Sequence, residues 1–457
     1  MKVQHIQHLY QRLGFGIVPN QLVQITNKDR HQIVDELFYK SSSMTNLSID
    51  TTDLDHYTSE TVIGNKKKLF EFRDKSKEKL KAYNLAWIER LINTNEALRE
   101  RMTLFWANHF VCRDENVFHM VQYNNILREY ALGDFGDFVK AISKEPSMLK
   151  YLNNKQNRKQ KPNENFAREL MELFMLGESH YSEEDIKESA RAFTGYNNNF
   201  EGEFVFRRMH HDYGFKTFFG STGRYNGDDI IDIILEQKQC ARFICKKIYS
   251  YFVNETIDDA KVEELTSIFY KDYNIEKLMR HIFMSDWFYQ QEHIGAKIKS
   301  PIEFLVGICR TVPVTFESSM DVLKIQKLLG QMLLNPPNVA GWKGGKNWID
   351  SNTIMIRLKL PSILLANARI STKEKGEFED AFEAYITKKR KNKFVNVTVD
   401  WETFEKQFAD YSINELQELL LLPKLSEGTK TYLKTLSKSS KQEYCVQLMS
   451  LPEYQMC

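Results

Sequence analysis

Apolar positions recur at helical spacing over most of the chain. In residues 97–111 one stripe contains Leu98, Met102 and Phe105 and also takes in His109. Positions three and four apart lie on one face of a helix. The pattern therefore predicts a helix over 97–111 with a histidine on its apolar face.

The segment 163–176 has the same period, with Asn163 placed as an N-cap and Gly177 as a left-handed C-cap. Comparable patterns predict further helices over residues 116–132, 182–193, 228–236, 239–252, 260–270, 275–284, 301–310, 318–329, 353–365, 378–388, 413–421 and 441–449.

Two regions interrupt the helical pattern. Residues 41–68 are rich in Ser, Thr, Asn and Asp, which indicates a long, mobile surface loop. Residues 204–206 and 216–219 are short β-prone runs, and we expect them to pair as a hairpin near 203–219. The fold class predicted is all-α, multi-helix, with one small β-hairpin. A large helical domain over 1–368 and a smaller helical part over 369–457 are expected.

Composition narrows the function classes without naming a reaction. Of the 457 residues, 63 are Lys or Arg and 61 are Asp or Glu, so a net charge of +2 provides no global field for nucleic acid. No run approaches the roughly 18 apolar residues of a membrane span. The first residues lack the apolar core of a signal peptide, which predicts a cytoplasmic protein. Six scattered cysteines without a C-x-x-C pair disfavour a cysteine zinc site.

One face of the predicted helix 163–176 is densely polar. At about 100° per residue, one arc holds Glu164, Asn165, Arg168, Glu169 and Glu172. A solvated face with i,i+4 ion pairs explains this pattern. A cleft in which paired carboxylates bind a hard cation or share acid–base work explains it equally well.

Three other segments carry candidate chemistry. His109 is either a core histidine or, if burial lowers its pKa, a neutral base or ligand. His211, Asp212 and Lys216 follow the first β-prone run, where a histidine and an aspartate could hold a transition metal or simply form a turn.

The segment 335–349 surrounds Trp342 with a Pro-Pro pair and three glycines. This composition predicts a shaped loop with exposed backbone amides and an aromatic surface. Such a loop could bind a sugar face or an anion, or it could be a packed structural loop.

These motifs together resemble the bacterial family catalogued as domain of unknown function 1800. The resemblance rests on HLYQRLGFG from His8, LRERMTLFWANHF from Leu98, PNENFARELMELFMLG from Pro162, HHDYGFKTFFGSTGRYNGDDIIDIIL from His210 and PPNVAGWKGGKNWI from Pro336, in the family's order over nearly the whole chain. The family carries no assigned reaction. Its members are often exported and often encoded beside sulfatase-like proteins, which implies envelope or polysaccharide biology.

The resemblance makes a shared site at the polar motifs more plausible. We predict an enzyme that hydrolyses a polar, saccharide-type substrate, with a divalent metal as an open alternative. A non-catalytic protein that binds a glycan or a protein in the same groove is the second hypothesis. Nucleic acid is not an expected partner. The residues predicted are Glu169, Glu172, His109 and Arg168 for catalysis, Asn163, Glu164, Asn165, Lys216 and Trp342 for substrate binding, and His211 and Asp212 for metal.

Overall fold

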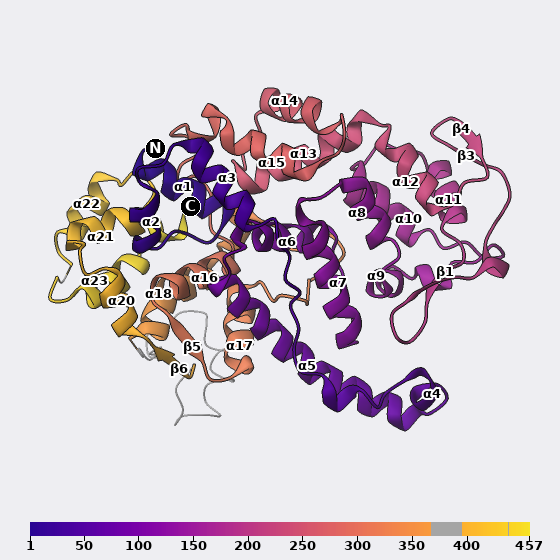
Figure 1. Cartoon of the computed structure of the whole chain (residues 1–457), viewed down its shortest axis with the longest axis horizontal. Helices are drawn as coiled ribbons and strands as arrows, with labels where there is room; N and C mark the ends of the chain where they lie inside the picture. The colour runs from indigo at the N-terminus through magenta and orange to yellow at the C-terminus, as the bar shows by residue number, and fades with distance from the viewer. Residues whose placement is uncertain (367–394, 437) are drawn as a thin grey trace.

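The computed structural model describes residues 1–366, 395–436 and 438–457 (Figure 1). Helices dominate these residues, which confirms the predicted fold class. The first half of the chain forms α1 (Val3–Leu13), α2 (Pro19–Ile25), α3 (Arg30–Lys40), η1 (Thr52–Leu54), α4 (Ser59–Val62), α5 (Lys66–Asn93), α6 (Ala97–His109), α7 (Val117–Glu129), η2 (Tyr130–Leu132), α8 (Phe135–Ile142), α9 (Pro146–Tyr151), η3 (Asn154–Gln156), α10 (Asn165–Glu169), η4 (Leu170–Met175) and α11 (Glu183–Ala192).

The second half continues the helical architecture. Its helices are η5 (Arg208–His210), α12 (Gly227–Leu235), α13 (Lys238–Phe252), α14 (Asp259–Phe269), α15 (Ile275–Met284), η6 (Asp286–Tyr289), α16 (Pro301–Thr311), α17 (Ser319–Leu329), η7 (Gly345–Trp348), α18 (Ser351–Leu365), α20 (Trp401–Gln407), α21 (Ile413–Leu420), α22 (Glu427–Leu433), α23 (Lys441–Met449) and η9 (Pro452–Gln455). In the part of the chain that the structure describes, no helix combines the length and the apolar character needed to cross a bilayer.

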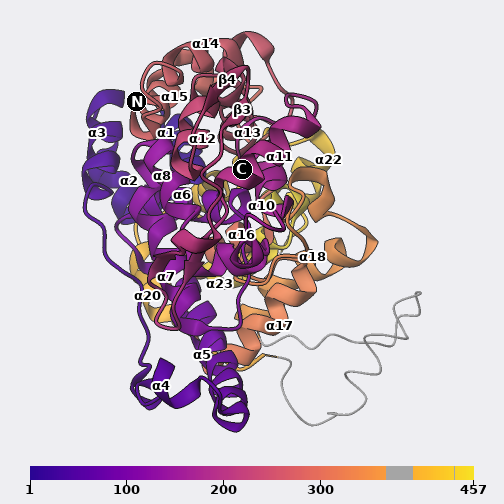
Figure 2. The same cartoon turned by 90° about the vertical axis from the view of Figure 1, so that its right-hand side faces the viewer.

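Two large hydrophobic clusters organise the helices. The first joins α1–α3 to α6–α15 and contains the apolar face of α6, as the stripe at 97–111 predicts. The second joins α5 and α16–α18 to α20, α21 and α23. Figure 1 shows the corresponding arrangement, with α20–α23 gathered beside α1 and α2 at one end of the molecule and α8–α12 at the other, and Figure 2 looks onto the α8–α12 end.

The β structure differs from the predicted hairpin. Strand β2 (Phe204–Phe206) pairs with β1 (Tyr196–Asn198), and β3 (Lys216–Phe218) pairs with β4 (Ser221–Gly223), both antiparallel. Pairing of 204–206 with 216–219 is therefore a wrong prediction. Each strand has a nearer neighbour along the chain, and a shorter loop costs less closure entropy. A third pair joins β5 (Val314–Phe316) to β6 (Val397–Val399).

The polar segment 41–68 is not one uninterrupted loop. It contains the short helices η1 and α4, and it buries Leu54 and Val62 in a small cluster with Phe72 of α5. Its mobility stays a prediction.

The predicted division into parts at 368/369 lies in residues 367–394, outside the described residues, as does the helix predicted over 378–388. On either side of that gap, α18 and α23 pack in the same hydrophobic cluster.

Candidate functional site

The helix predicted over 163–176 changes character half-way along. It begins as α10 at Asn165 with Glu164, rather than the predicted Asn163, at the N-cap position. Asn163 Oδ1 accepts the backbone N–H of Asn165 (3.1 Å) and so holds the preceding turn. From Leu170 it widens into the π-helix η4, in which Met171 O accepts the N–H of Leu176 (2.8 Å). Gly177 ends it with φ +85°, as predicted. Single π turns inside helices are frequent at functional sites.

The end of this helix leaves backbone carbonyls that cannot bond within it. Three of these carbonyls accept side-chain donors from other elements. His109 Nε2 lies 3.0 Å from Phe174 O, Lys247 Nζ lies 2.7 Å from Leu173 O, and Gln239 Nε2 lies 2.8 Å from Leu176 O. One histidine of α6 and two residues of α13 therefore converge on a single helix terminus.

His109 and Lys247 also contact each other. His109 Nδ1 lies 3.3 Å from Lys247 Nζ. A carbonyl oxygen only accepts, so Nε2 must carry the imidazole proton toward Phe174 O, and Nδ1 is left as an acceptor. Lys247 then donates a hydrogen bond to Nδ1. The side-chain partner of the buried imidazole is therefore an amine.

Burial shifts the pKa values of both groups. His109 is 4% exposed, and its burial, followed by the charge of Lys247, holds its pKa well below the usual range. Burial also lowers the pKa of Lys247 to about 8. The imidazole is therefore neutral at physiological pH, while the amine is close to its midpoint.

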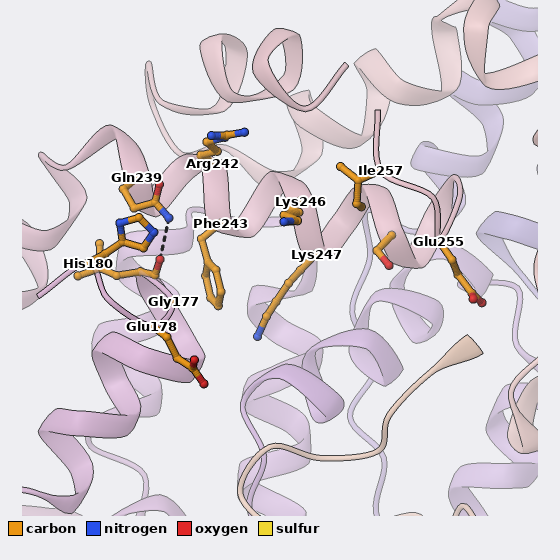
Figure 3. Close-up of a pocket in the computed structure, with 12 residues that line it drawn as sticks. Gly177, Glu178, His180, Gln239, Arg242, Phe243, Lys246, Lys247, Glu255 and Ile257 are labelled. Carbon is orange, nitrogen blue, oxygen red and sulfur yellow. Dashed lines mark hydrogen bonds between the residues drawn. The ribbon is translucent and has the colours of Figure 1, made fainter. Parts of the chain in front are cut away.

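Lys247 lies on the wall of a hollow with two adjoining parts, of which Figure 3 shows the larger. The larger part, of about 520 Å³, runs along α13 beside Gly177 and Gln239. The smaller, of about 360 Å³, is lined by His109 and Asn108. Lys247, Ser250 and Glu255 line both parts.

The α13 side chains that line the hollow leave the helix in different directions. Figure 3 shows Phe243 and Lys247 projecting to the same side, whereas Arg242 projects to the other. The Lys247 ammonium lies 4.5 Å from the centroid of the Phe243 ring. Arg242 also lines the larger part of the hollow, and its guanidinium pairs with Asp259 at 2.9 Å.

Positive groups outnumber carboxylates around this hollow. Its lining includes Arg242, Lys246, Lys247 and Lys297 against the carboxylates of Glu178 and Glu255, although burial lowers the pKa of Lys297 well below its usual range. A concave surface lined mainly by one sign of charge attracts ligands of the opposite sign.

The loop around Trp342 closes the smaller part. Asn108 Oδ1 accepts the Trp342 N–H (2.8 Å), and Asn108 Nδ2 donates to Trp342 O (3.1 Å). At Gly345 the φ of +64° favours glycine, and a Cβ would lie 2.1 Å from the Glu255 carboxylate, which would have to move. The half-buried Trp342 thus belongs to the His109 side of the helix, rather than to the groove predicted beside the carboxylates.

The predicted carboxylate cluster occupies a partly exposed face of α10–η4. Arg168 pairs with Glu164 (3.3 Å) and with Glu183 (3.0 Å). Glu172 Oε2 accepts the Tyr181 hydroxyl (2.9 Å). Burial and the charge of Glu172 raise the pKa of Glu169. Asn165 is exposed, and neither part of the hollow is lined by these residues.

The residues predicted to bind metal serve a different local role. His211 Nδ1 lies 2.8 Å from Thr194 O, and Asp212 pairs with Arg191 at 2.8 Å. Lys216 Nζ donates to Asp212 O (2.6 Å). Among residues 1–366, 395–436 and 438–457, no group of three or more His, Cys, Asp or Glu side chains is arranged to hold a metal ion. These side chains therefore fix a loop.

Sequence reasoning missed the α13 side of the site. Phe243, Lys247 and Tyr251 stand at i, i+4 and i+8, so a lysine lies between two aromatic residues on one helix face. This pattern could have indicated a polar site beside α13, because a lysine on a packed helix face needs a polar partner. Glu255 and Gln239 carry no comparable signal, since their roles depend on which loop packs against α13.

Comparison with known proteins places the chain in a family. The family described as Protein of unknown function (DUF1800) matches residues 8–456. The chain belongs to this family. No curated protein and no solved structure matches it. In this DUF1800 chain, the geometry around Lys247 is the feature that bears most directly on function.

Proposed function

We propose that the protein binds a small anionic molecule in the hollow around Lys247 and hydrolyses it with that lysine as general acid. The observation that carries the proposal is the hydrogen-bonded pair of Lys247 and His109 at the wall of the hollow, with 3.3 Å between Nζ and Nδ1. A saccharide that bears a carboxylate fits both the excess of basic groups and the polysaccharide biology that the family resemblance implies.

The chemistry needs a donor and an acceptor of protons. An acid with a pKa near the working pH transfers protons most efficiently, and burial brings the pKa of Lys247 to about 8. Its ammonium form would protonate the leaving oxygen. Glu255, which lines both parts of the hollow, is the carboxylate able to accept a proton from the attacking water. His109 acts as a positioning residue, because its Nδ1 accepts the Lys247 N–H.

Binding is tested by calorimetry with glucuronate, using glucose as the neutral control. We expect Lys247→Met to weaken glucuronate binding by roughly ten- to a hundredfold, since hydrogen bonds to charged groups contribute ~1.5–3 kcal/mol. Glu255→Gln removes a negative charge from the lining and should tighten binding. Lys238→Met is the matched control, because Lys238 also lies on α13, pairs with Glu263 and lines neither part of the hollow.

Hydrolysis is tested separately with 4-nitrophenyl glucuronides. Release of nitrophenol that is lost in both Lys247→Met and Glu255→Gln supports the enzyme. Glucuronate binding without turnover of any glucuronide would favour the non-catalytic glycan-binding protein. Equal affinity for glucose and glucuronate would contradict the proposal that the hollow binds an anionic ligand.

A further inference from the structure

A second surface, unrelated to the hollow, presents large apolar side chains to solvent. In the connection between β2 and β3, Met209 is 80% exposed, Tyr213 is 56% exposed and Phe215 is 63% exposed. Single exposed apolar residues are ordinary, but three within seven positions form a patch of the kind that marks an interaction site.

The chain holds this connection in place with polar groups. Lys216 is 1% exposed, and its ammonium donates to the carbonyls of Asp212 (2.6 Å) and Gly214 (3.1 Å). Arg191 of α11 anchors the Asp212 carboxylate at 2.8 Å. A buried ammonium costs free energy unless it is hydrogen-bonded, so the two carbonyl contacts fix the backbone around it.

Two buried residues flank a run of exposed residues in this braced loop. His211, which is 4% exposed, and Lys216 point inward, whereas Tyr213 and Phe215 between them point outward. The polar motif that suggested a metal site thus presents two aromatic rings at fixed positions.

Basic side chains surround the exposed patch. The backbone N–H of Lys159 donates to His210 O (2.8 Å), which places the loop 155–161 against the connection 207–216. The exposed basic residues of these segments and of the adjoining β4 end are Arg158, Lys159, Lys161, Arg207, Arg208 and Arg224. Throughout the described residues none of the six forms an ion pair with a carboxylate, although the guanidinium of Arg224 lies 5.2 Å from the Phe215 ring.

The concentration of charge is local. The whole chain carries a net charge of only +2, yet six unpaired cations meet around three apolar side chains. The one acidic residue of the connection, Asp212, is bound by Arg191. In Figure 1 this region, around β1, β3 and β4, forms the end of the molecule opposite α20–α23, so it can approach a flat surface.

We propose that residues 155–161 and 207–216 dock the protein onto an anionic lipid surface. Lys and Arg side chains are attracted to anionic headgroups, and aromatic rings favour the boundary between headgroups and acyl chains. Met209, the most exposed of the three, offers no ring to stack on a sugar or a base, whereas an acyl chain accepts it. This apolar centre within a basic rim favours lipid over an acidic polysaccharide or a nucleic acid.

The test is flotation of the full-length protein with phosphatidylcholine vesicles, with and without phosphatidylglycerol. Binding is expected only to the anionic vesicles and should weaken with added salt. Each basic residue near an anionic leaflet contributes a factor of about five in affinity, so Arg207→Gln/Arg208→Gln should lose roughly thirtyfold. Lys66→Gln/Lys67→Gln, a pair of exposed lysines on α5, is the matched charge control.

Insertion of the apolar centre is measured independently of charge. Tyr213→Ser/Phe215→Ser should lose binding at unchanged net charge, whereas Phe70→Ser, at another exposed phenylalanine (65%), should not. The six native cysteines are buried, so Met209→Cys can be labelled selectively with a polarity-sensitive dye, whose emission should rise with anionic vesicles.

The outcomes separate the alternatives. Equal binding to neutral and anionic vesicles, or none to either, overturns the proposal. Binding to heparin or DNA without binding to vesicles reassigns the surface to a polyanion and also overturns it. Melting curves of the variants show whether a loss of binding reflects unfolding, and the labelled Met209→Cys protein keeps the test decisive if a serine variant fails to fold.

Discussion

The helix formed by α10 and η4 has two chemically different sides. Its outer side carries charged side chains at regular spacing, and they pair with one another and with Glu183 in partial contact with solvent. Its inner end offers backbone carbonyls, and these bind the side chains of His109 and Lys247. The charged cluster that the sequence displays on one helix face is thus partly exposed, and its charges pair with one another. The group whose pKa is lowered by burial is a lysine from another helix.

Burial explains the difference between the two sides. A charged group in water keeps its ordinary ionisation, whereas a buried one must pair or become neutral. Arg168 has a side chain that is 36% exposed and lies among carboxylates. Lys247 faces a ring, a carbonyl and a neutral imidazole, so its pKa falls to about 8. Substitutions on each side of the α10–η4 helix test this difference in burial.

The largest loss of stability is expected for His109→Ala. The ring is 4% exposed and lies against Phe110 and Trp106, with centroids 4.5 and 5.3 Å away. Its removal leaves a cavity and an unpaired carbonyl, so the free energy of unfolding should fall by roughly 2–4 kcal/mol. Denaturant unfolding measures it, with the exposed His31→Ala as control. A loss below that of His31→Ala would contradict the buried role.

The next largest effect is a pH dependence of the free energy of unfolding, which Lys247→Met should remove. A lysine whose folded pKa is about 8 binds fewer protons in the folded than in the unfolded state between pH 8 and 10. The free energy of unfolding contributed by Lys247 therefore rises over this range, by on the order of 2 kcal/mol. Unfolding curves of wild type, Lys247→Met and the exposed Lys246→Met give the difference. Parallel pH profiles for wild type and Lys247→Met would exclude the lowered pKa.

A smaller effect is expected for Asn108→Ala, which releases the Trp342 backbone. Two hydrogen bonds are lost, so the free energy of unfolding should fall by ~1–2 kcal/mol. The loop should also become more open to trypsin at the exposed Lys343. Cleavage is followed by mass spectrometry, with the exposed Asn93→Ala as control. Unchanged cleavage would show that Asn108 does not hold the loop.

The smallest effect is expected on the carboxylate side. Glu169→Gln/Glu172→Gln should change the free energy of unfolding by no more than ~0.5 kcal/mol at neutral pH. The direction should be stabilising, because burial and the Glu172 charge raise the pKa of Glu169 and so oppose its ionised form. A loss of glucuronate binding in this variant would show that Glu169 and Glu172 belong to the binding site. It would contradict the functional difference between the two sides of the helix.

The local pattern of the sequence determined much of the fold. The apolar stripe of 97–111 predicts α6, and Gly177 predicts the end of η4, because both depend on residues a few positions apart. The polar arc from Glu164 to Glu172 was also visible, since its periodicity is set by the helix alone. Family membership was likewise readable from motifs over nearly the whole chain.

Only the tertiary structure decided which of these groups meet. His109 contacts Lys247, 138 positions away in the sequence, and Asn108 holds Trp342, 234 positions away. No periodicity encodes such contacts. The strands at 204–206 and 216–218 are a second example. Their β character could be predicted from the sequence, but the strands with which they pair could not. A side chain's type is fixed by the sequence, but its pKa depends on burial and on its neighbours, which the packing of distant helices supplies.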